Sequence, residues 1–289
     1  MMKRTRTMLT FVSILFLVFG LSACGPEEEK DSDAETAPTL PPESSMVMDF
    51  SDFTDSSTAT KTLNMGYELQ SHILPAVTNY GYAATKVWLW NTVLWVNMAV
   101  PVAAFRQALL NTPRRQSDGT WVWTYTVTVG NDVYTASLHG KVVETNVNWT
   151  MYITKDGVYA DTEWFTGTSA LDGTGGTWAL NYSTTINTAP TTPLLNITWS
   201  KDATADTLEL RFTSKIAVGK IVVDDYVEYA VTGNSPYDAR YHIYIEDALT
   251  QIEWNRESKA GRITDPVHYE HNDWYCWDSG HGDTTCPAP

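Results

Sequence analysis

Histidine and carboxylate side chains gather near the end of the chain, where they could bind a metal ion. His268, His271 and Asp273 lie in one short stretch, and His281 follows in the same tail. Imidazole and carboxylate groups are ordinary ligands of zinc and similar ions. On a strand, however, His268 and His271 would point to opposite faces, and they lack the i, i+4 spacing that places two ligands on one helical face. We therefore expect a solvated polar tail without a metal or another cofactor.

Aromatic side chains near predicted turns are the second chemical candidate. Trp164, Trp274 and Trp277 occupy positions where exposed indole rings could stack on sugar rings. Alternatively, these rings close the ends of a hydrophobic core. The group predicts a ligand-binding surface if the rings are exposed, and a structural role if they are buried.

Evidence for catalysis in the sequence is slight. Asp161 and Glu163 would share one face of a strand, which is the arrangement of an acid and base pair in a glycosidase. Paired acids are common in so acidic a chain. The sequence contains no Gly-x-Ser-x-Gly motif, phosphate-binding loop or dinucleotide fingerprint. We favour a protein that is not an enzyme, and hydrolysis of an envelope polymer is the least favoured alternative.

Composition excludes further classes of function. The 289 residues carry a formal net charge of −15, from 34 acidic and 19 basic side chains. Since nucleic-acid binding requires clustered Lys and Arg, we expect no nucleic-acid partner. With 43% hydrophobic residues the chain can bury a core, and its 12 Trp, 15 Tyr and many Thr residues favour strands over helices.

The first 24 residues have the pattern of a secretory leader. Lys3, Arg4 and Arg6 precede an apolar run over residues 8–20, which is shorter than the ~20 residues of a transmembrane helix. We expect residues 1–23 to be a signal peptide that is removed. Its loss makes the remaining chain three charges more negative, because the leader contains no acidic residue.

The leader ends in Leu21-Ser22-Ala23-Cys24, which resembles the lipobox of bacterial lipoproteins. The resemblance implies that Cys24 receives diacylglycerol, becomes the new N-terminus and carries further acyl chains such as palmitate. Two or three acyl chains would hold the protein at a membrane. Gly25 stands where an Asp retains enterobacterial lipoproteins in the inner membrane, so the resemblance implies an outer-membrane location, on the periplasmic face or the cell surface. An ordinary cleaved signal peptide is the alternative.

A polar segment follows the anchor. Residues 24–45 are rich in Pro, Ser and Glu and show no apolar periodicity, which predicts a disordered acidic linker. The acidic run over residues 27–33 is also similar to the surface-export signals of Bacteroidetes-type lipoproteins. The simpler interpretation is a solvated spacer.

The remaining two cysteines form an even pair. Once Cys24 is assigned to lipid, Cys276 and Cys286 stand alone in an exported chain, and export places them in an oxidising compartment. We predict a disulfide that clasps the tail, residues 271–289. Closing so short a loop should contribute roughly 2–3 kcal/mol.

The body of the chain, residues 46–289, predicts one β-rich domain with helices near its start. Residues 61–112 are helical by pattern, in two stretches, and Pro101 either kinks the second helix or begins a new one. A transmembrane helix over residues 87–105 is less favoured, because Asn91, Asn97 and Pro101 interrupt it.

From residue 120 the hydrophobic period changes to two. Trp121, Trp123 and Tyr125 alternate with Val122 and Thr124, and similar alternation recurs with turn residues between the segments up to residue 270. About 10–12 strands in hairpin succession form an antiparallel meander whose apolar face must be covered. We predict a mainly β fold of the α+β class, a curved meander or open barrel wrapped around the apolar helices.

This arrangement is similar to that of Lol-pathway lipoprotein carriers and receptors, in which a half-closed sheet covered by helices holds acyl chains. The similarity rests on the anchor and on the pairing of a sheet with helices, and it assigns no residue. We therefore expect a lipid-anchored envelope protein that binds an apolar ligand or serves structurally, and the alternative is a carbohydrate-binding or adhesive surface lipoprotein.

Overall fold

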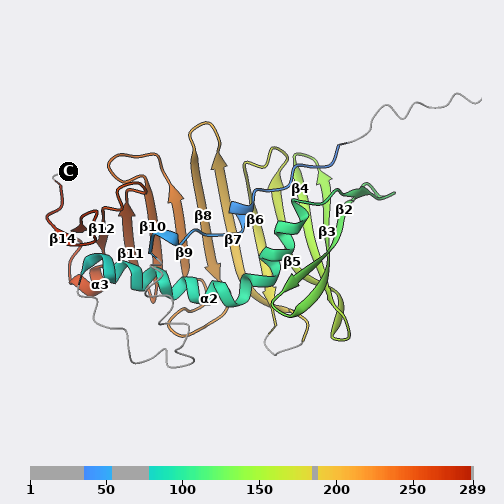
Figure 1. Ribbon diagram of the computed structural model, residues 1–289, viewed down its shortest axis with the longest axis horizontal. Helices are drawn as coiled ribbons and strands as arrows, with labels where there is room; N and C mark the ends of the chain where they lie inside the picture. Colours follow the sequence, from blue (N-terminus) through green and yellow to red (C-terminus); the bar gives the residue numbers. More distant parts are fainter. Residues whose placement is uncertain (1–35, 54–77, 184–187, 288–289) are drawn as a thin grey trace, which may run out of the picture. The chain divides into compact units, whose positions relative to one another are not determined.

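The computed structural model describes residues 36–53, 78–183 and 188–287 (Figure 1). The chain divides into two compact units, Met1–Thr36 and Ala37–Pro289. All of the described helices and strands belong to the second unit. The leader and Cys24 lie outside the described residues.

One antiparallel sheet of 14 strands makes up most of the second unit, and each strand pairs with the next along the chain without closing into a cylinder. This confirms the predicted mainly β, open meander of the α+β class. The sheet extends beyond residues 120–270 at both ends, because strands also form at 114–115 and in the tail. The strands are β1 (Arg114–Arg115), β2 (Trp121–Val129), β3 (Asp132–Val143), β4 (Asn146–Lys155), β5 (Tyr159–Ala170), β6 (Gly175–Tyr182), β7 (Thr192–Asp202), β8 (Thr207–Ser214), β9 (Tyr226–Val231), β10 (Ala239–Ile245), β11 (Ala248–Trp254), β12 (Gly261–Thr264), β13 (Tyr275–Trp277) and β14 (Asp283–Thr284).

The alternation in the sequence becomes the two faces of this sheet. On β2, Trp123, Tyr125 and Val127 are buried, whereas Thr124 and Thr126 between them are exposed. The same alternation along the other strands gives an inner face that belongs to the core and an outer face that meets solvent.

Tryptophan rings on the inner face lie over glycines of neighbouring strands. Gly167 is paired with Trp178 across β5 and β6, and Gly261 is paired with Trp277 across β12 and β13. A Cβ atom would lie 2.2 Å from the Trp178 ring at Gly167 and 2.3 Å from the Trp277 ring at Gly261. These positions accept no side chain, because the indole ring fills the space above the backbone.

Strand β5 departs from simple alternation. Its pairing with β4 shifts between Met151 and Tyr152, and the extra residue of the bulge makes Trp164 and Phe165 consecutive buried residues. This explains why the period of two does not reveal β5 in the sequence.

Helix α2 (Asn79–Ala108) crosses the inner face and contacts β12 and β13 at one end and β2 and β3 at the other (Figure 1). Trp90 and Phe105 are 1% exposed, which confirms the expected apolar core helix. The helix bends by 72° between Asn79–Thr92 and Asn97–Ala108. Pro101 lies inside the second half, after the bend, so it neither begins a new helix nor marks the bend itself.

No single helix among the described residues is long and apolar enough to cross a membrane, although the two bent halves of α2 would pass that test together by length and composition. The expected helix before residue 78 falls mostly in residues 54–77, which lie outside the described part of the chain.

The segment before α2 is packed rather than free. Pro38, Pro41 and Ser45 are buried, and the hydroxyl of Ser45 accepts a hydrogen bond from Nε1 of Trp178 at 3.2 Å. The predicted linker boundary at residue 45 is therefore wrong for residues 37–45. Proline rings supply apolar surface without any periodic pattern, so the sequence did not indicate this packing. The segment contains the short helices η1 (Glu43–Ser45) and η2 (Ser51–Phe53).

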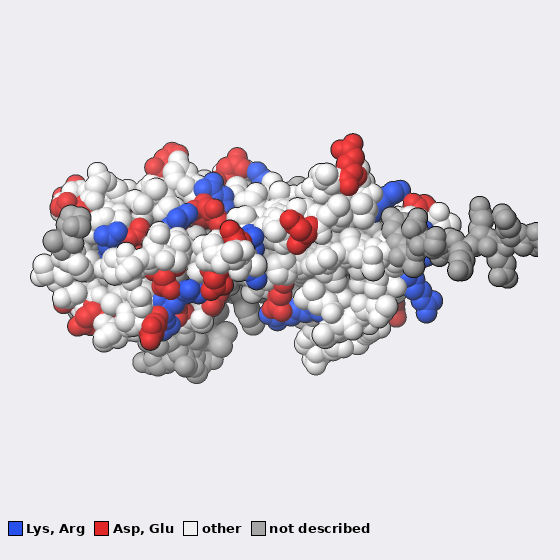
Figure 2. Space-filling model, turned by 90° about the horizontal axis from the view of Figure 1, so that it is seen from above, with Lys and Arg blue, Asp and Glu red and all other residues white. Residues whose placement is uncertain are grey.

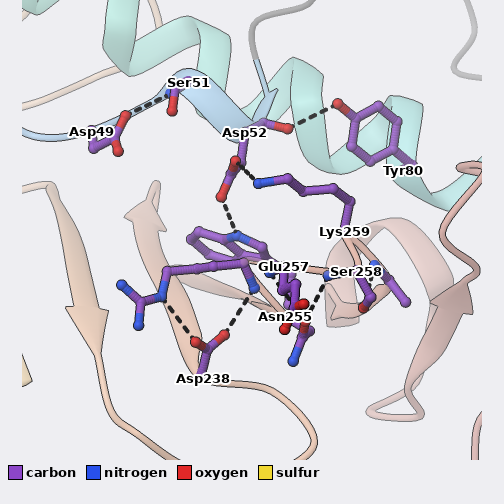
Figure 3. A network of polar contacts seen from close by, with 12 residues as sticks. Asp49, Ser51, Asp52, Tyr80, Asp238, Asn255, Glu257, Ser258 and Lys259 are labelled. Atoms are coloured by element: carbon purple, nitrogen blue, oxygen red, sulfur yellow. Dashed lines mark hydrogen bonds and ion pairs between the residues drawn. The ribbon is translucent and has the colours of Figure 1, made fainter.

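Polar contacts of Asp52 hold η2 against both the helix and the sheet (Figure 3). Its carboxylate accepts hydrogen bonds from Nε1 of Trp254 at 2.7 Å and Nζ of Lys259 at 2.5 Å. Its carbonyl accepts the hydroxyl of Tyr80 on α2 at 3.0 Å. One residue thus joins three elements that are distant in sequence.

Candidate functional site

The outer face of the sheet is neutral and rich in hydroxyl groups over strands β2–β7. Outward positions there hold mostly Thr, Ser and Asn, and neighbouring strands place them directly opposite one another. Thr168 and Thr177, for example, approach to 3.0 Å between hydroxyl oxygens. This face offers hydrogen bonds but few charges.

Over strands β8–β12 the same face carries charged side chains in two cross-strand rows. Arg211, Glu228 and His242 are directly opposed on β8, β9 and β10. Two residues away along the strands, Arg240, Glu253 and Arg262 are opposed on β10, β11 and β12. Figure 2 shows the resulting mixture of blue and red on the side of the molecule where these strands lie.

Glu228 is the centre of the first row. Arg211 donates to its Oε2 through Nη2 at 2.6 Å and Nε at 2.9 Å, and Arg240 approaches its Oε1 at 3.3 Å. Nδ1 of His242 lies 3.4 Å from the same oxygen. The hydrogen bond from His242 and the two arginines outweigh the cost of burial and lower the pKa of Glu228 to about 2.

Arg262 is the centre of the second row. Its Nη2 and Nε donate to Oε2 of Glu253 at 2.6 and 2.8 Å. Its guanidinium lies 4.1 Å from the ring centre of Trp274 and 5.0 Å from that of Tyr237. A guanidinium this close to two aromatic rings forms cation–π contacts with both of them.

A partly open hollow of about 330 Å³ lies beside this row. Arg240 is one of the lining residues, and its Nε is buried without a hydrogen-bond partner among the described residues. The volume is at the small end of the range typical of ligand pockets. The lining residues are Thr232, Asn234, Ser235, Pro236, Tyr237, Ala239, Arg240, Glu253 and Arg262.

The disulfide lies close to the two aromatic residues that contact Arg262. Cys276 and Cys286 are bonded, as predicted from the cysteine count. Cys276 is paired with Arg262 across β13 and β12, and its Sγ lies 4.0 Å from the hydroxyl of Tyr237. Sγ of Cys286 lies 3.1 Å from the carbonyl oxygen of Trp274. The disulfide therefore lies beside the hydroxyl of Tyr237 and the backbone of Trp274.

The three tryptophans predicted from the sequence do not come together. Trp274 is partly exposed and contacts Arg262, which lines the hollow, although Trp274 itself is not a lining residue. Trp164 is 8% exposed and Trp277 is 1% exposed, and Nε1 of Trp277 donates to the carbonyl of Lys259. For these two residues the structural interpretation holds, because both are buried in the core and Trp277 covers Gly261.

The histidine-rich stretch does not form a metal centre in the part of the chain that the structure describes, where no group of three ligand side chains converges. His268 lies in the short helix α3 (Pro266–Tyr269) and stacks on Tyr82 at 3.8 Å. His271 lies 3.4 Å from Asp273, in the one contact between predicted ligands. The third histidine of the tail, His281, stacks on Tyr80 at 3.6 Å.

The acidic pair on β5 does not form a buried site either. Asp161 and Glu163 are both exposed, and the amide and side chain of Asp161 contact the hydroxyl of Thr154. Water-exposed carboxylates lack the enclosed setting that separates the pKa values of an acid and a base.

Asp265 is the buried carboxylate of this end of the molecule, and its role is structural. It accepts hydrogen bonds from Nζ of Lys86 at 2.8 Å, the hydroxyl of Tyr82 at 2.7 Å and that of Thr250 at 2.9 Å. Its other oxygen caps α3 through the amide groups of Val267 and His268. Burial opposes its ionisation, but these donors lower its pKa to about 2.

Sequence reasoning missed Tyr237, Arg240, Glu253 and Arg262. Each stands at an outward position of a strand or a turn, and the weak indication available was a charged or aromatic residue between inward apolar ones. Their meeting depends on the register of β10, β11 and β12, which no periodicity reveals. No family model, curated protein or solved structure matches this chain.

Proposed function

We propose that this protein is a lipid-anchored protein of the cell envelope that binds carbohydrate, without catalysis, in the hollow on the outer face of β10–β12. The observation that carries the proposal is the guanidinium of Arg262 between the rings of Trp274 and Tyr237 at the edge of that hollow.

The chemistry of the lining suits a sugar ring. A sugar has apolar C–H faces that can lie on aromatic rings, and a rim of hydroxyl groups that both donate and accept hydrogen bonds. In the lining, Tyr237 supplies a ring, Arg240 and Arg262 the donors, and Glu253 the acceptor. Trp274 adds a second ring beside Arg262. The site also offers Thr232 and Asn234, which can donate and accept. Few polar groups in a defined arrangement are what specificity in a small pocket requires.

The inner face is less suited to an apolar ligand, the occupant expected from the resemblance to Lol-pathway proteins. Helix α2 and residues 37–53 already cover that face and bury large side chains against it, among them Trp90, Phe105 and Phe53. An acyl chain would have to displace these contacts, whereas the outer hollow is open to solvent.

The anchor rests on the sequence at Leu21–Cys24, and with it the proposed location in the outer membrane. Mass spectrometry of the N-terminal peptide tests it. We expect a peptide that begins at Cys24 and carries diacylglycerol, and a Cys24→Ala variant that leaves the membrane fraction. An unmodified peptide that begins elsewhere would contradict the anchor and leave the binding proposal standing.

Thermal unfolding of the full chain in detergent with a panel of neutral and acidic glycans tests the binding. A ligand that binds only the folded state raises the melting temperature. We expect a shift with at least one glycan, which is lost in Trp274→Ala and kept in Tyr152→Ala. Tyr152 is the matched control, because it is a partly exposed aromatic residue on the outer face of β4. A shift that survives in Trp274→Ala, or no shift with any glycan, would reject the proposed site.

A further inference from the structure

A second aromatic cluster lies on the same outer face. Tyr226 and Tyr244 are directly opposed on β9 and β10, and their rings stack at 5.4 Å with an angle of 7° between them. The guanidinium of Arg211 lies 4.1 Å from the ring centre of Tyr226. Both tyrosines are only partly buried. We call these three residues the tyrosine platform.

The tyrosine platform and the hollow repeat one chemical theme. Each combines two aromatic rings with an arginine that is paired to a glutamate, Arg211 with Glu228 and Arg262 with Glu253. Neither cluster belongs to the hydrophobic core, because both lie on the face of the sheet opposite α2.

The two clusters are joined by strand β10. Arg240 lines the hollow and Tyr244 belongs to the platform, four residues along the same strand. At ~3.4 Å per residue their backbones are about 14 Å apart. The outward residue between them is His242, beside Glu228. Hydrogen-bonding groups therefore connect the two aromatic clusters without a break.

We infer that the hollow and the tyrosine platform bind one linear oligosaccharide, so that the ligand is a chain longer than a single sugar. The inference rests on the proposed carbohydrate function and specifies its ligand class. One ring of the chain occupies the hollow beside Trp274, and a later ring lies on Tyr226 and Tyr244. The groups of Arg240, His242 and Glu228 face the hydroxyls between them.

The charge of the two rows favours a neutral chain. Arg211, Arg240 and Arg262 are balanced by the glutamates that they contact, which are Glu209, Glu228 and Glu253. A polyanion would find no excess of positive charge here, and the formal net charge of −15 on the whole chain would repel it.

Binding of a length series of oligosaccharides to the full chain in detergent tests this inference. The probes are neutral linear glucans, α-1,4 and β-1,4 linked, from the monosaccharide to the hexasaccharide, with an oligogalacturonide of matched length. Two linked contacts strengthen binding beyond either contact alone. We expect affinity to rise about tenfold or more with length and then level off.

Two variants separate this inference from the proposed function. In Tyr226→Ala/Tyr244→Ala the rise with length should disappear while binding of the shortest ligand remains. In Trp274→Ala binding of all lengths should be lost. Equal affinity for all lengths in the unaltered chain, or a rise that persists in the tyrosine variant, would overturn the extended site but leave the hollow as a sugar site. Preference for the oligogalacturonide would overturn the inference that the oligosaccharide is neutral. Failure of all probes to bind would reject the proposed function itself.

Discussion

The two halves of the sheet share an inner face and differ in their outer face. In both halves tryptophan rings cover glycines, as at Gly167 in β5 and Gly261 in β12. Outside, strands β2–β7 present mainly neutral hydroxyl groups, whereas β8–β12 present arginine, glutamate and aromatic rings. Since one inner pattern serves both halves, the halves differ in their outer side chains, and the proposed binding role is based on that difference.

The second half is also joined more tightly to the rest of the molecule. Asp265 connects α2, α3 and β11, Asp52 connects η2 to Trp254, and the disulfide fixes the tail. The first half relies on backbone pairing, hydrophobic contacts and single polar contacts such as the hydrogen bond from Trp178 to Ser45. A surface that holds a ligand in a defined geometry benefits from such fixed supports.

The largest effect on stability is expected from Asp265→Ala. The substitution leaves Lys86 and the hydroxyls of Tyr82 and Thr250 without their partner. Removing one member of a buried ion pair costs about 3–5 kcal/mol. Urea unfolding measures the change, and Glu163→Ala, at an exposed carboxylate of β5, should stay within about 0.5 kcal/mol. Similar losses in both variants would mean that Asp265 does not link the elements of the second half.

Removal of the disulfide should cost less and act locally. In Cys276→Ser/Cys286→Ser the tail loses a constraint worth roughly 2–3 kcal/mol, and Tyr237 and Trp274 lose the support behind them. We expect cooperative unfolding to remain and hydrogen exchange to increase in β13 and β14. Loss of all cooperative unfolding would show that the bond is central to the domain and not confined to its tail.

Because the two halves share an inner face, replacing a covered glycine by alanine should lower the free energy of unfolding by a similar amount in each half. Gly167→Ala and Gly261→Ala each force a Cβ atom into an indole ring and a neighbouring carbonyl group. Overpacking of this kind costs about 1–3 kcal/mol. Chemical denaturation should give comparable losses for both, and Gly282→Ala, where a Cβ meets only ordinary contacts, should be nearly neutral. A cost in one half alone would contradict the common inner pattern.

Acid should weaken the second half first. The folded pKa values of Glu228 and Asp265 are about 2, against ordinary values of 4.5 and 3.8. Because both are lowered, the stability from ionisation is present above the ordinary values and is lost as pH falls through about 2. Glu228→Gln should reduce stability at neutral pH and flatten this acid loss, as followed by unfolding at successive pH values. Thr168→Val, on the outer face of β5, should change neither the stability at neutral pH nor its loss in acid. An unchanged acid profile in Glu228→Gln would refute the lowered pKa of Glu228 as a cause of that loss.

The sequence predicted the meander because inward and outward residues alternate on strands such as β2. It missed the bulge in β5, which makes Trp164 and Phe165 consecutive buried residues, and it missed the packed segment that contains Ser45. It also predicted the disulfide, since two cysteines of an exported chain remain once Cys24 is set aside.

The candidate site was less accessible to prediction. Trp274 was identified by its type and its place near a turn, but Trp277 met the same criteria and is buried. Arg240 and Arg262 meet Tyr237 and Trp274 only because the register of β10, β11 and β12 aligns them. Register is set by pairing over whole strands, and no local pattern encodes it.

Hydrogen exchange of the full chain, with and without the neutral oligosaccharide that stabilises it most, tests the central claim most directly. The amide groups of β9–β12 and of residues 232–237 should exchange more slowly with the ligand bound, while those of β2–β6 should not change. Protection confined to β2–β6, or no protection at a ligand concentration that raises the melting temperature, would contradict the assignment of binding to the charged and aromatic half of the outer face.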